Sequence, residues 1–414
     1  MRLNILFITL DFPYPLNAGG NVAIFYRIKE LSKRGHNIFL FSASPSTINK
    51  ETIKSLKKYC RYIKVYTPRK TEVLFNLFRF PLLPISGIRR YSKKMQRDIN
   101  AFLISQKIDI LFIEHSIMAI YLPKDHLKTI KSILVLHALG YKSLFRLAKE
   151  LPIFSIKKLI YYIESLKMKR FEYNIFKLNK FDEFWFYSID DINDILRKTR
   201  KSIKNKIKLI PIGTEPKIDF QVKQKIFPGV SLTDKVILTI GCMDSPINED
   251  YVRWFVKDIF PKIKKNVPKA KFCIIGKNSK NKLKDIVSKD IIVVGEVSDL
   301  KPYLNRCDLY VVPVRTGAGL RVKLLDGFSA RKIIITTPIG IEAIKDIKPN
   351  IHLLLAKNEE EFANKAIDVL KNPRKYNYIA ENGFKFFKEN FSVETVGAVI
   401  ENNLISIVQS ERLK

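Results

Sequence analysis

The segment LYVVPVRTGAGLRVKLLDGFSARKIIITT, residues 309–337, contains the pattern that decides the fold. Leu309–Val312 is an apolar run of strand length, and after a glycine-containing loop a helix is predicted over Lys323–Ala330. Ile333–Thr336 then predicts a second strand. A strand, a helix and a strand in this order are typical of a β-α-β unit with parallel strands.

The same alternation extends in both directions along the chain. Strands are predicted at Leu3–Leu10, Asn37–Phe41, Tyr62–Tyr66, Ile108–Ile113, Ile133–His137, Glu183–Ser188 and Ile207–Ile210, and then at Val236–Gly241, Lys271–Ile275, Ile291–Val294, Leu309–Val312, Ile333–Thr336 and His352–Leu355. Helices are predicted between them, the longest over Arg89–Ser105 and Ser155–Leu178. The segment 211–235 separates the two series; its three prolines, two glycines and lack of periodicity predict a linker.

The sequence therefore predicts an α/β protein with two doubly wound domains, residues 1–212 and residues 213–391. A helix from about residue 392 to residue 414 is expected to pack back on the first domain. Ligands of such sheets bind at the carboxyl ends of the strands. Two domains of this kind that face each other form a cleft, which is the expected place for a pair of substrates.

Composition excludes several classes of protein. The chain has 414 residues, and its 46 % hydrophobic and 28 % charged residues exclude wholesale disorder. Its four cysteines, at positions 60, 242, 273 and 307, form no CxxC pair, so no metal site is predicted. No run of about 18 apolar residues is present, and Leu3–Leu10 lacks the cleavage site of a signal peptide. A cytoplasmic location is expected.

The charge is strongly basic, with 74 Lys and Arg against 40 Asp and Glu and a formal net charge of +34. An excess of this size attracts polyanions such as nucleic acid, an anionic membrane or a phosphorylated substrate. A compositional bias toward Lys, Ile, Asn and Phe along the whole chain would produce the same excess.

Two glycine-containing loops are candidates for binding an anion. Gly19 and Gly20 precede a predicted helix, where backbone N–H groups can approach a ligand closely, although an ordinary turn has the same pattern. In the second loop, residues 317–323, two glycines precede Arg321 and Lys323 in the first turn of a helix, an unfavourable end for cations unless an anion binds there. Asp326 lies on the same face and could accept the hydroxyls of a ribose. A solvated helix end is the alternative.

The order of these segments resembles that of retaining glycosyltransferases of the GT-B fold, family 4. The phrases that carry the resemblance are GGNVAIFYRIKELSKRGHNIFLFS (19–42), IEHS (113–116), VLH (135–137), FYSIDDINDI (186–195), IPIGTE (210–215), LTIGCMDSPINEDYVRWF (238–255), AKFCIIGK (270–277) and VSDLKPYLNRCDLYVVPVRTGAGLRVKLLDGF (297–328). The resemblance covers nearly the whole chain. It implies two Rossmann-like domains that face each other across a cleft, with the nucleotide-sugar held mainly by the second.

The resemblance also implies roles for individual residues. The implied catalytic residues are His137, Arg321 and Lys323, and the implied donor-binding residues are Gly19, Gly20, Gly241, Gly317, Ala318, Gly319, Leu320 and Asp326. Ala318 stands where the first glutamate of the family's Glu-x7-Glu motif would be, and Asp326 replaces the second. The implied activity is transfer of a sugar, of hexosyl type, from a nucleotide-sugar to a glycan or lipid-linked acceptor with retention, in cell-surface polysaccharide or glycoconjugate synthesis. No cofactor, metal or nucleic-acid partner is expected.

Three other functions remain open from the sequence. An inactive scaffold of the same fold would explain Ala318 and Asp326. A nucleotide-sugar epimerase has the same architecture, and a nucleic-acid-binding protein would explain the charge, although no recognition motif supports it.

A peripheral membrane contact is also predicted. The stretch 54–97 has thirteen basic residues and one acidic residue, and it encloses the apolar cluster LFNLFRFPLLPI, residues 74–85. Such a pattern suits an anionic membrane surface, with Arg89, Arg90, Lys93 and Lys94 among the cations. A helix and loop packed on the sheet, with lysines merely in solvent, is the alternative.

Overall fold

The computed structural model describes residues 1–412 except 17–18, 45–47, 124–129, 200 and 219–225. The first sheet has the strand order β3-β2-β1-β4-β5-β6-β7, and every pair of neighbours is parallel. Its strands are β1 Asn4–Thr9, β2 Asn37–Ala43, β3 Tyr62–Tyr66, β4 Ile110–Glu114, β5 Lys131–Leu136, β6 Glu183–Phe186 and β7 Ile207–Leu209.

The second sheet is also parallel, with the order β10-β9-β8-β11-β12-β13. Its strands are β8 Lys235–Ile240, β9 Ala270–Ile275, β10 Ile291–Gly295, β11 Leu309–Val312, β12 Ile334–Thr336 and β13 Leu354–Leu355. In both sheets the strand order reverses beside the first strand of the series, which places a topological switch point at β1/β4 and at β8/β11. The predicted doubly wound α/β architecture is confirmed.

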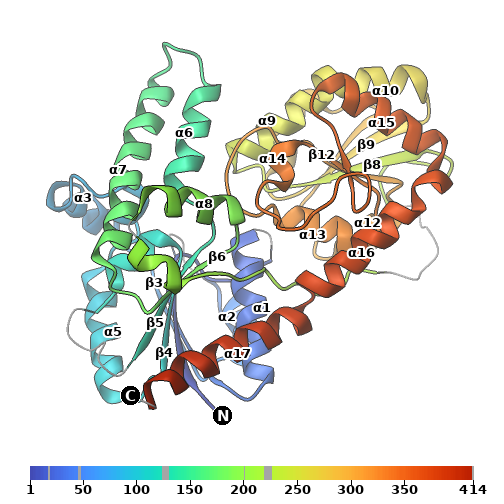
Figure 1. Cartoon of the computed structure of the whole chain (residues 1–414). Helices are drawn as coiled ribbons and strands as arrows, with labels where there is room; N and C mark the ends of the chain where they lie inside the picture. Colours follow the sequence, from blue (N-terminus) through green and yellow to red (C-terminus); the bar gives the residue numbers. More distant parts are fainter. Residues whose placement is uncertain (17–18, 45–47, 124–129, 200, 219–225, 413–414) are drawn as a thin grey trace.

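Helices cover both sheets, as Figure 1 shows. Those of the first half are α1 Gly19–Lys33, α2 Lys50–Lys57, α3 Lys70–Arg79, α4 Ile85–Ile88, α5 Lys93–Ser105, α6 Gly140–Glu150, α7 Ile156–Leu178 and α8 Ile189–Lys198. Those of the second half are α9 Pro246–Trp254, α10 Phe260–Asn266, α11 Ser279–Lys282, α12 Lys301–Arg306, α13 Val322–Ser329, α14 Pro338–Ile341, α15 Glu359–Lys371, α16 Asn377–Phe391 and α17 Val393–Arg412. A π-helical turn, Phe255–Ile259, joins α9 to α10.

The central strands are buried on both faces, which is why they are almost continuously apolar. In β1 the residues Ile5 to Ile8 have no exposed surface, and Phe7 stacks on Phe112 of β4 with ring centroids 4.9 Å apart. Some expected boundaries are wrong by a few residues; the helix predicted from Arg89, for example, begins at Lys93. Ser92 ends the preceding loop there, and its hydroxyl accepts a hydrogen bond from the backbone N–H of Met95.

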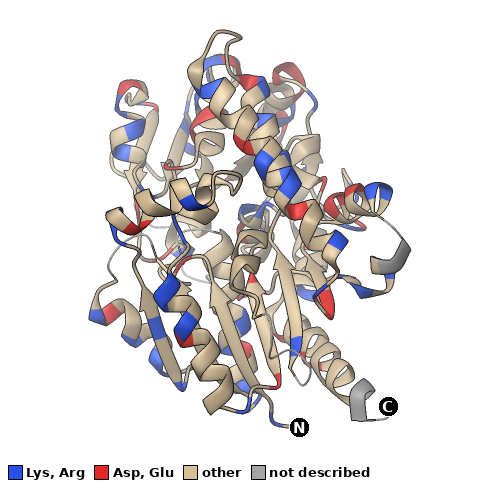
Figure 2. Cartoon of the chain, turned by 90° about the vertical axis from the view of Figure 1, so that its left-hand side faces the viewer, with Lys and Arg blue, Asp and Glu red and all other residues tan. Residues whose placement is uncertain are grey.

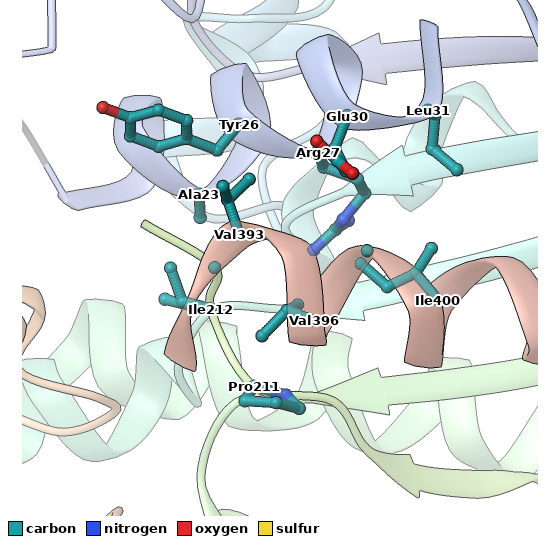
Figure 3. Close-up of a pocket in the computed structure, with 12 residues that line it drawn as sticks. Ala23, Tyr26, Arg27, Glu30, Leu31, Pro211, Ile212, Val393, Val396 and Ile400 are labelled. Carbon is teal, nitrogen blue, oxygen red and sulfur yellow. The ribbon is translucent and has the colours of Figure 1, made fainter. Parts of the chain in front are cut away.

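The chain crosses between the two halves twice, at adjacent places. The N–H of Thr214 donates to the carbonyl of Phe391, and the N–H of Val393 donates to the carbonyl of Thr214. After the second crossing, α17 packs on α1, where Arg34 pairs with Glu401 at 2.6 Å. Figure 3 shows this packing around a cavity of about 10 Å³, large enough for about one water molecule.

The domain boundary between residues 212 and 213 stays a prediction. Part of the predicted linker, residues 219–225, lies outside the described residues, and so do residues 413–414 of the predicted C-terminal helix. Among the helices that the structure describes, none combines the length and the apolar character needed to cross a bilayer.

Candidate active site

The carboxyl ends of β4 and β5 bring two histidines together. His115 follows β4 and His137 follows β5, and because these strands are neighbours the two rings stack with centroids 3.7 Å apart. Nε2 of His137 lies 2.8 Å from Oε2 of Glu114, the last residue of β4. His137 was predicted as the end of a strand; the strand ends at Leu136, so His137 begins the loop at the sheet edge.

A buried arginine fixes this arrangement from the first helix. Arg27 of α1 pairs with the other carboxylate oxygen of Glu114 at 2.5 Å and donates to the hydroxyl of Tyr187. Burial raises the pKa of Glu114, which has no exposed surface, and the charge of Arg27 opposes that rise. With Glu114 held as an acceptor, Nε2 of His137 donates the hydrogen bond and its Nδ1 is left as an acceptor.

Burial also holds both histidines neutral. It lowers the pKa of His137 and of His115 well below the usual 6.5, and at His115 the neighbouring His137 adds to the effect. The pair therefore presents ring nitrogens as hydrogen-bonding groups at neutral pH, without a positive charge.

The predicted glycines Gly19 and Gly20 open α1 directly beside this pair. A Cβ on Gly20 would lie 3.4 Å from Nε2 of His115 and 3.6 Å from Nδ1 of His137. A Cβ on Gly19 would lie 2.9 Å from Cγ2 of Val322, in α13 of the second half. The glycine pair thus lies where the two halves meet.

The second predicted loop, residues 317–323, contacts the same region from the second half of the chain. Gly317 and Gly319 have φ angles of 101° and 79°, a backbone conformation that side chains disfavour. A Cβ on Gly319 would lie 2.6 Å from the carbonyl oxygen of His137. The structure therefore brings together His137, Gly19, Gly20 and the loop 317–320, including Ala318 and the partly buried Leu320.

Arg321 differs from its predicted position and contacts. It precedes α13 instead of lying in the first turn, and its guanidinium turns back into its own loop. Nη1 donates to the carbonyls of Ala318 and Gly319 at 2.6 and 3.1 Å. Burial lowers its pKa to about 10. Arg321 therefore holds the shape of the loop, and in this arrangement these hydrogen-bond donors are not directed at an outside ligand.

Lys323 is a cation whose hydrogen bonds, among the contacts of the described residues, go only to neutral partners. Its Nζ donates to Oδ1 of Asn248 at 2.7 Å and to the hydroxyl of Tyr251 at 2.9 Å, both from α9. Burial lowers the pKa of Lys323 to about 7, and the charge of Arg321 adds to the effect. Gly241 belongs to the same cluster, because a Cβ there would lie 2.7 Å from the Tyr251 hydroxyl.

Asp326 lies one turn further along α13. Its Oδ1 pairs with Nζ of Lys217 at 2.5 Å, and the backbone N–H of Lys217 donates to the carbonyl of Ser329. The pair leaves Asp326 partly exposed. A ribose at this place would meet a carboxylate that already pairs with a lysine.

Among the residues of this site that sequence reasoning missed, four lie around the segment 317–326. Asn248 and Tyr251 lie within a quoted motif but carry no signal of their own, and Lys217 comes from the segment predicted as a linker. The fourth, Arg146 of α6, crosses from the first half to the second: its Nη1 donates to the carbonyl of Gly317, and the guanidinium pairs with Glu342 at 2.5 and 3.0 Å.

No group of three or more His, Cys, Asp or Glu side chains suited to a metal ion occurs in the part of the chain that the structure describes. The roles of the predicted site residues on a substrate stay predictions.

Comparison with known proteins identifies the second half. Residues 234–372 match the family model described as Glycosyl transferases group 1. A curated relative, the uncharacterized 44.6 kDa protein in the cps region of Klebsiella pneumoniae, is 26 % identical over 406 residues, which are 95 % of this chain and 97 % of the relative.

Solved structures support the fold over the whole chain. The sucrose-phosphate synthase of Thermosynechococcus elongatus aligns with a TM-score of 0.72 and 14 % identity over 98 % of this chain and 100 % of its own. HepE of Anabaena, in complex with UDP-glucose, has a TM-score of 0.68 and 14 % identity, with 98 % and 100 % covered. A mutant of S. aureus TarM, in complex with Fondaparinux, alpha-GlcNAc-glycerol and UDP, has a TM-score of 0.67 and 14 % identity, with 97 % and 100 % covered. The two parallel sheets form the GT-B fold.

Proposed function

Because residues 234–372 match the family model of the group 1 glycosyl transferases, we propose that this chain is a glycosyltransferase that transfers a hexose from a nucleotide-diphosphate donor to a glycan or lipid-linked acceptor with retention of configuration. The relative in a cps region supports a role in capsule or other cell-surface polysaccharide synthesis. The neighbours that contain UDP support a nucleotide-sugar as the donor.

The observation that carries the proposal is the environment of Lys323. A partly buried ammonium whose hydrogen bonds go to a neutral amide and a phenol is destabilised relative to its state in water. A diphosphate beside Lys323 would supply the missing negative charge, and the N–H groups of residues 317–319 would share it. In the transition state the charge on the leaving diphosphate grows, so the same groups stabilise departure of the nucleotide.

The first half supplies the other side of the reacting centre. Since Gly319 abuts the carbonyl of His137, a sugar on the diphosphate would lie against the histidine pair. Because Nε2 of His137 contacts Glu114, its Nδ1 would be the acceptor for a sugar hydroxyl. Glu114 itself is engaged by Arg27 and His137, which favours retention by attack on the face of the departing phosphate over a carboxylate nucleophile.

A cytoplasmic enzyme that docks on the inner membrane face is the localisation we propose. The apolar residues of α3 support it, because Leu74, Phe75, Leu77 and Phe78 are exposed. Arg90 does not belong to the docking cations named above: it donates to the carbonyl of Leu10 and pairs with Asp11 at 3.0 Å.

A two-step experiment tests the function. Thermal shift with a panel of UDP-, GDP- and other nucleotide-sugars identifies the donor, because a ligand of the folded state raises its melting temperature. Transfer to polysaccharide or lipid-linked acceptors is then followed by NMR of the anomeric centre. Donor binding without transfer would indicate a scaffold, an altered sugar formed without acceptor would indicate an epimerase, and an inverted product would contradict retention.

A further inference from the structure

Helices α6 and α7 form a hairpin that projects from the first half, as the upper part of Figure 1 shows. Its base is fixed: the buried carboxylate of Glu172 in α7 accepts hydrogen bonds from the N–H of Gly140 and the hydroxyl of Ser116. At its tip the side chains point into solvent, since Ile153 is 79 % exposed and Phe154 is 99 % exposed.

The exposed apolar surface continues down α7. The exposed large apolar residues of this helix, in its first eleven positions, are Ile156, Leu159, Ile160, Tyr162, Ile163 and Leu166. Between the helices lies an apolar groove of about 330 Å³ bounded by Phe145, Leu159 and Tyr162. Contiguous apolar surface of this extent is uncommon on a soluble protein and marks a site of interaction.

The segment α3–α4 is tied to α7. The N–H of Ile85, at the start of α4, donates to Oε2 of Glu164 at 2.7 Å and so joins the α3–α4 segment to α7. The exposed residues of α3 therefore lie on the same side of the molecule as α7.

The charges around the tip favour an anionic partner. Between residues 149 and 158, next to the tip, there are three basic residues and one acidic residue, Glu150. Lys157 is exposed, and Lys149 lies over the ring of Phe145 at 4.9 Å. In Figure 2, which faces the side with α3 and α7, Lys and Arg positions are distributed along the helices. A second copy of the hairpin would bring like charges together, whereas anionic lipid headgroups would neutralise them.

We propose that the α6–α7 hairpin inserts its tip, Ile153 and Phe154, into an anionic bilayer, and that this contact supplies most of the membrane affinity of the enzyme. The inference rests on the membrane docking in the proposed function and names the element that performs it. Aromatic and aliphatic side chains enter the acyl boundary while the lysines remain among the headgroups. Because α6 also carries Arg146, which contacts Gly317, the docked hairpin would hold the active site close to a lipid-linked acceptor.

The test compares matched variants of the protein on vesicles of phosphatidylcholine alone and on vesicles that also contain anionic phosphatidylglycerol. We expect the double variant I153S/F154S to bind anionic vesicles at least about tenfold more weakly. The control I104S removes a side chain that is 71 % exposed on α5 and should bind as the wild type does. In F154W, brominated lipids should quench the added tryptophan.

Each outcome separates the inference from the proposed function. Unchanged binding of I153S/F154S, with loss in a variant carrying R89Q, K93Q and K94Q, would overturn the hairpin while keeping the membrane docking. If the wild-type protein binds none of the vesicles, both the hairpin insertion and the membrane docking are overturned. Donor thermal shift and transfer assays would still test the transferase activity. A wild-type dimer that the hairpin substitutions convert to a monomer would show a copy-to-copy interface and overturn the insertion.

Discussion

Replacing Lys323 with methionine should make the free protein more stable while making it a poorer binder of nucleotide. Lys323→Met keeps most of the unbranched side chain and removes a charge whose hydrogen-bond partners are neutral. If the site exists to bind an anion, the ammonium is destabilising when that anion is absent. The two effects therefore have opposite signs.

The magnitude follows from the pKa. Burial lowers the pKa of Lys323 from 10.5 to about 7, and each pKa unit corresponds to about 1.4 kcal/mol, so the charged form costs about 5 kcal/mol in the folded state. The cost is fully present below pH 7. It disappears as the pH rises toward 10.5, because the folded state then releases a proton that the unfolded state retains. Unpaired Asn248 and Tyr251 oppose the gain by roughly 1–3 kcal/mol, which leaves about 2–4 kcal/mol of net stabilisation at pH 6.

The assay is urea unfolding of both proteins between pH 6 and pH 9, with UDP titrations by calorimetry. We expect Lys323→Met to be the more stable at pH 6, with the difference shrinking as the pH rises. In the wild type, the affinity for UDP should fall above pH 7. In the variant, the affinity should be at least about tenfold weaker and independent of pH. Lys345→Met, at an exposed position of the same half, is the control. A variant that is less stable at pH 6 and binds UDP as well as the wild type would refute the reasoning.

Three further residues and one cross-domain contact give sharper tests of the site. Asp326→Asn should fold normally and bind donor several-fold more weakly, with Asp326→Ala weaker still; equal calorimetric affinities would contradict a ribose contact. Arg321→Ala should lower kcat/KM at least about tenfold and also lower Tm, because the loop carbonyls lose their donor; a normal Tm with lost activity would instead indicate direct contact with the diphosphate. His137→Asn should reduce kcat more than it changes donor Kd, and an equal effect on both would argue for a binding role alone. Arg146→Gln should raise the KM for the donor by loosening the loop at Gly317, which steady-state kinetics would detect.

The central strands could be predicted because burial on both faces makes them apolar runs, as in β1 and β11. The glycine positions of the loop were equally visible. The direction of the Arg321 side chain was not, because it depends on positive φ angles at Gly317 and Gly319 that turn carbonyls toward the guanidinium. Spacing along a sequence says nothing about such a turn.

Contacts between segments that lie far apart in the sequence could not be predicted either. Lys217 meets Asp326 across 109 residues, and Arg146 meets Gly317 across 171. Of the hairpin, only the second helix was predicted, over Ser155–Leu178, and apolar residues occur all around that helix. The periodicity of this helix therefore could not show which of its faces is packed against the protein and which is exposed.

The two adjacent crossings at Thr214 and Val393 have a kinetic consequence. Backbone hydrogen bonds tie them together, and α17 then remains on α1, so the halves can separate only by pivoting about one line. Such a pivot would move the two halves through solvent, and it would break the contact of Arg146 with Glu342. We expect turnover to slow in proportion to solvent viscosity wherever product departure limits the rate, and the slope to shrink when Arg146 is removed.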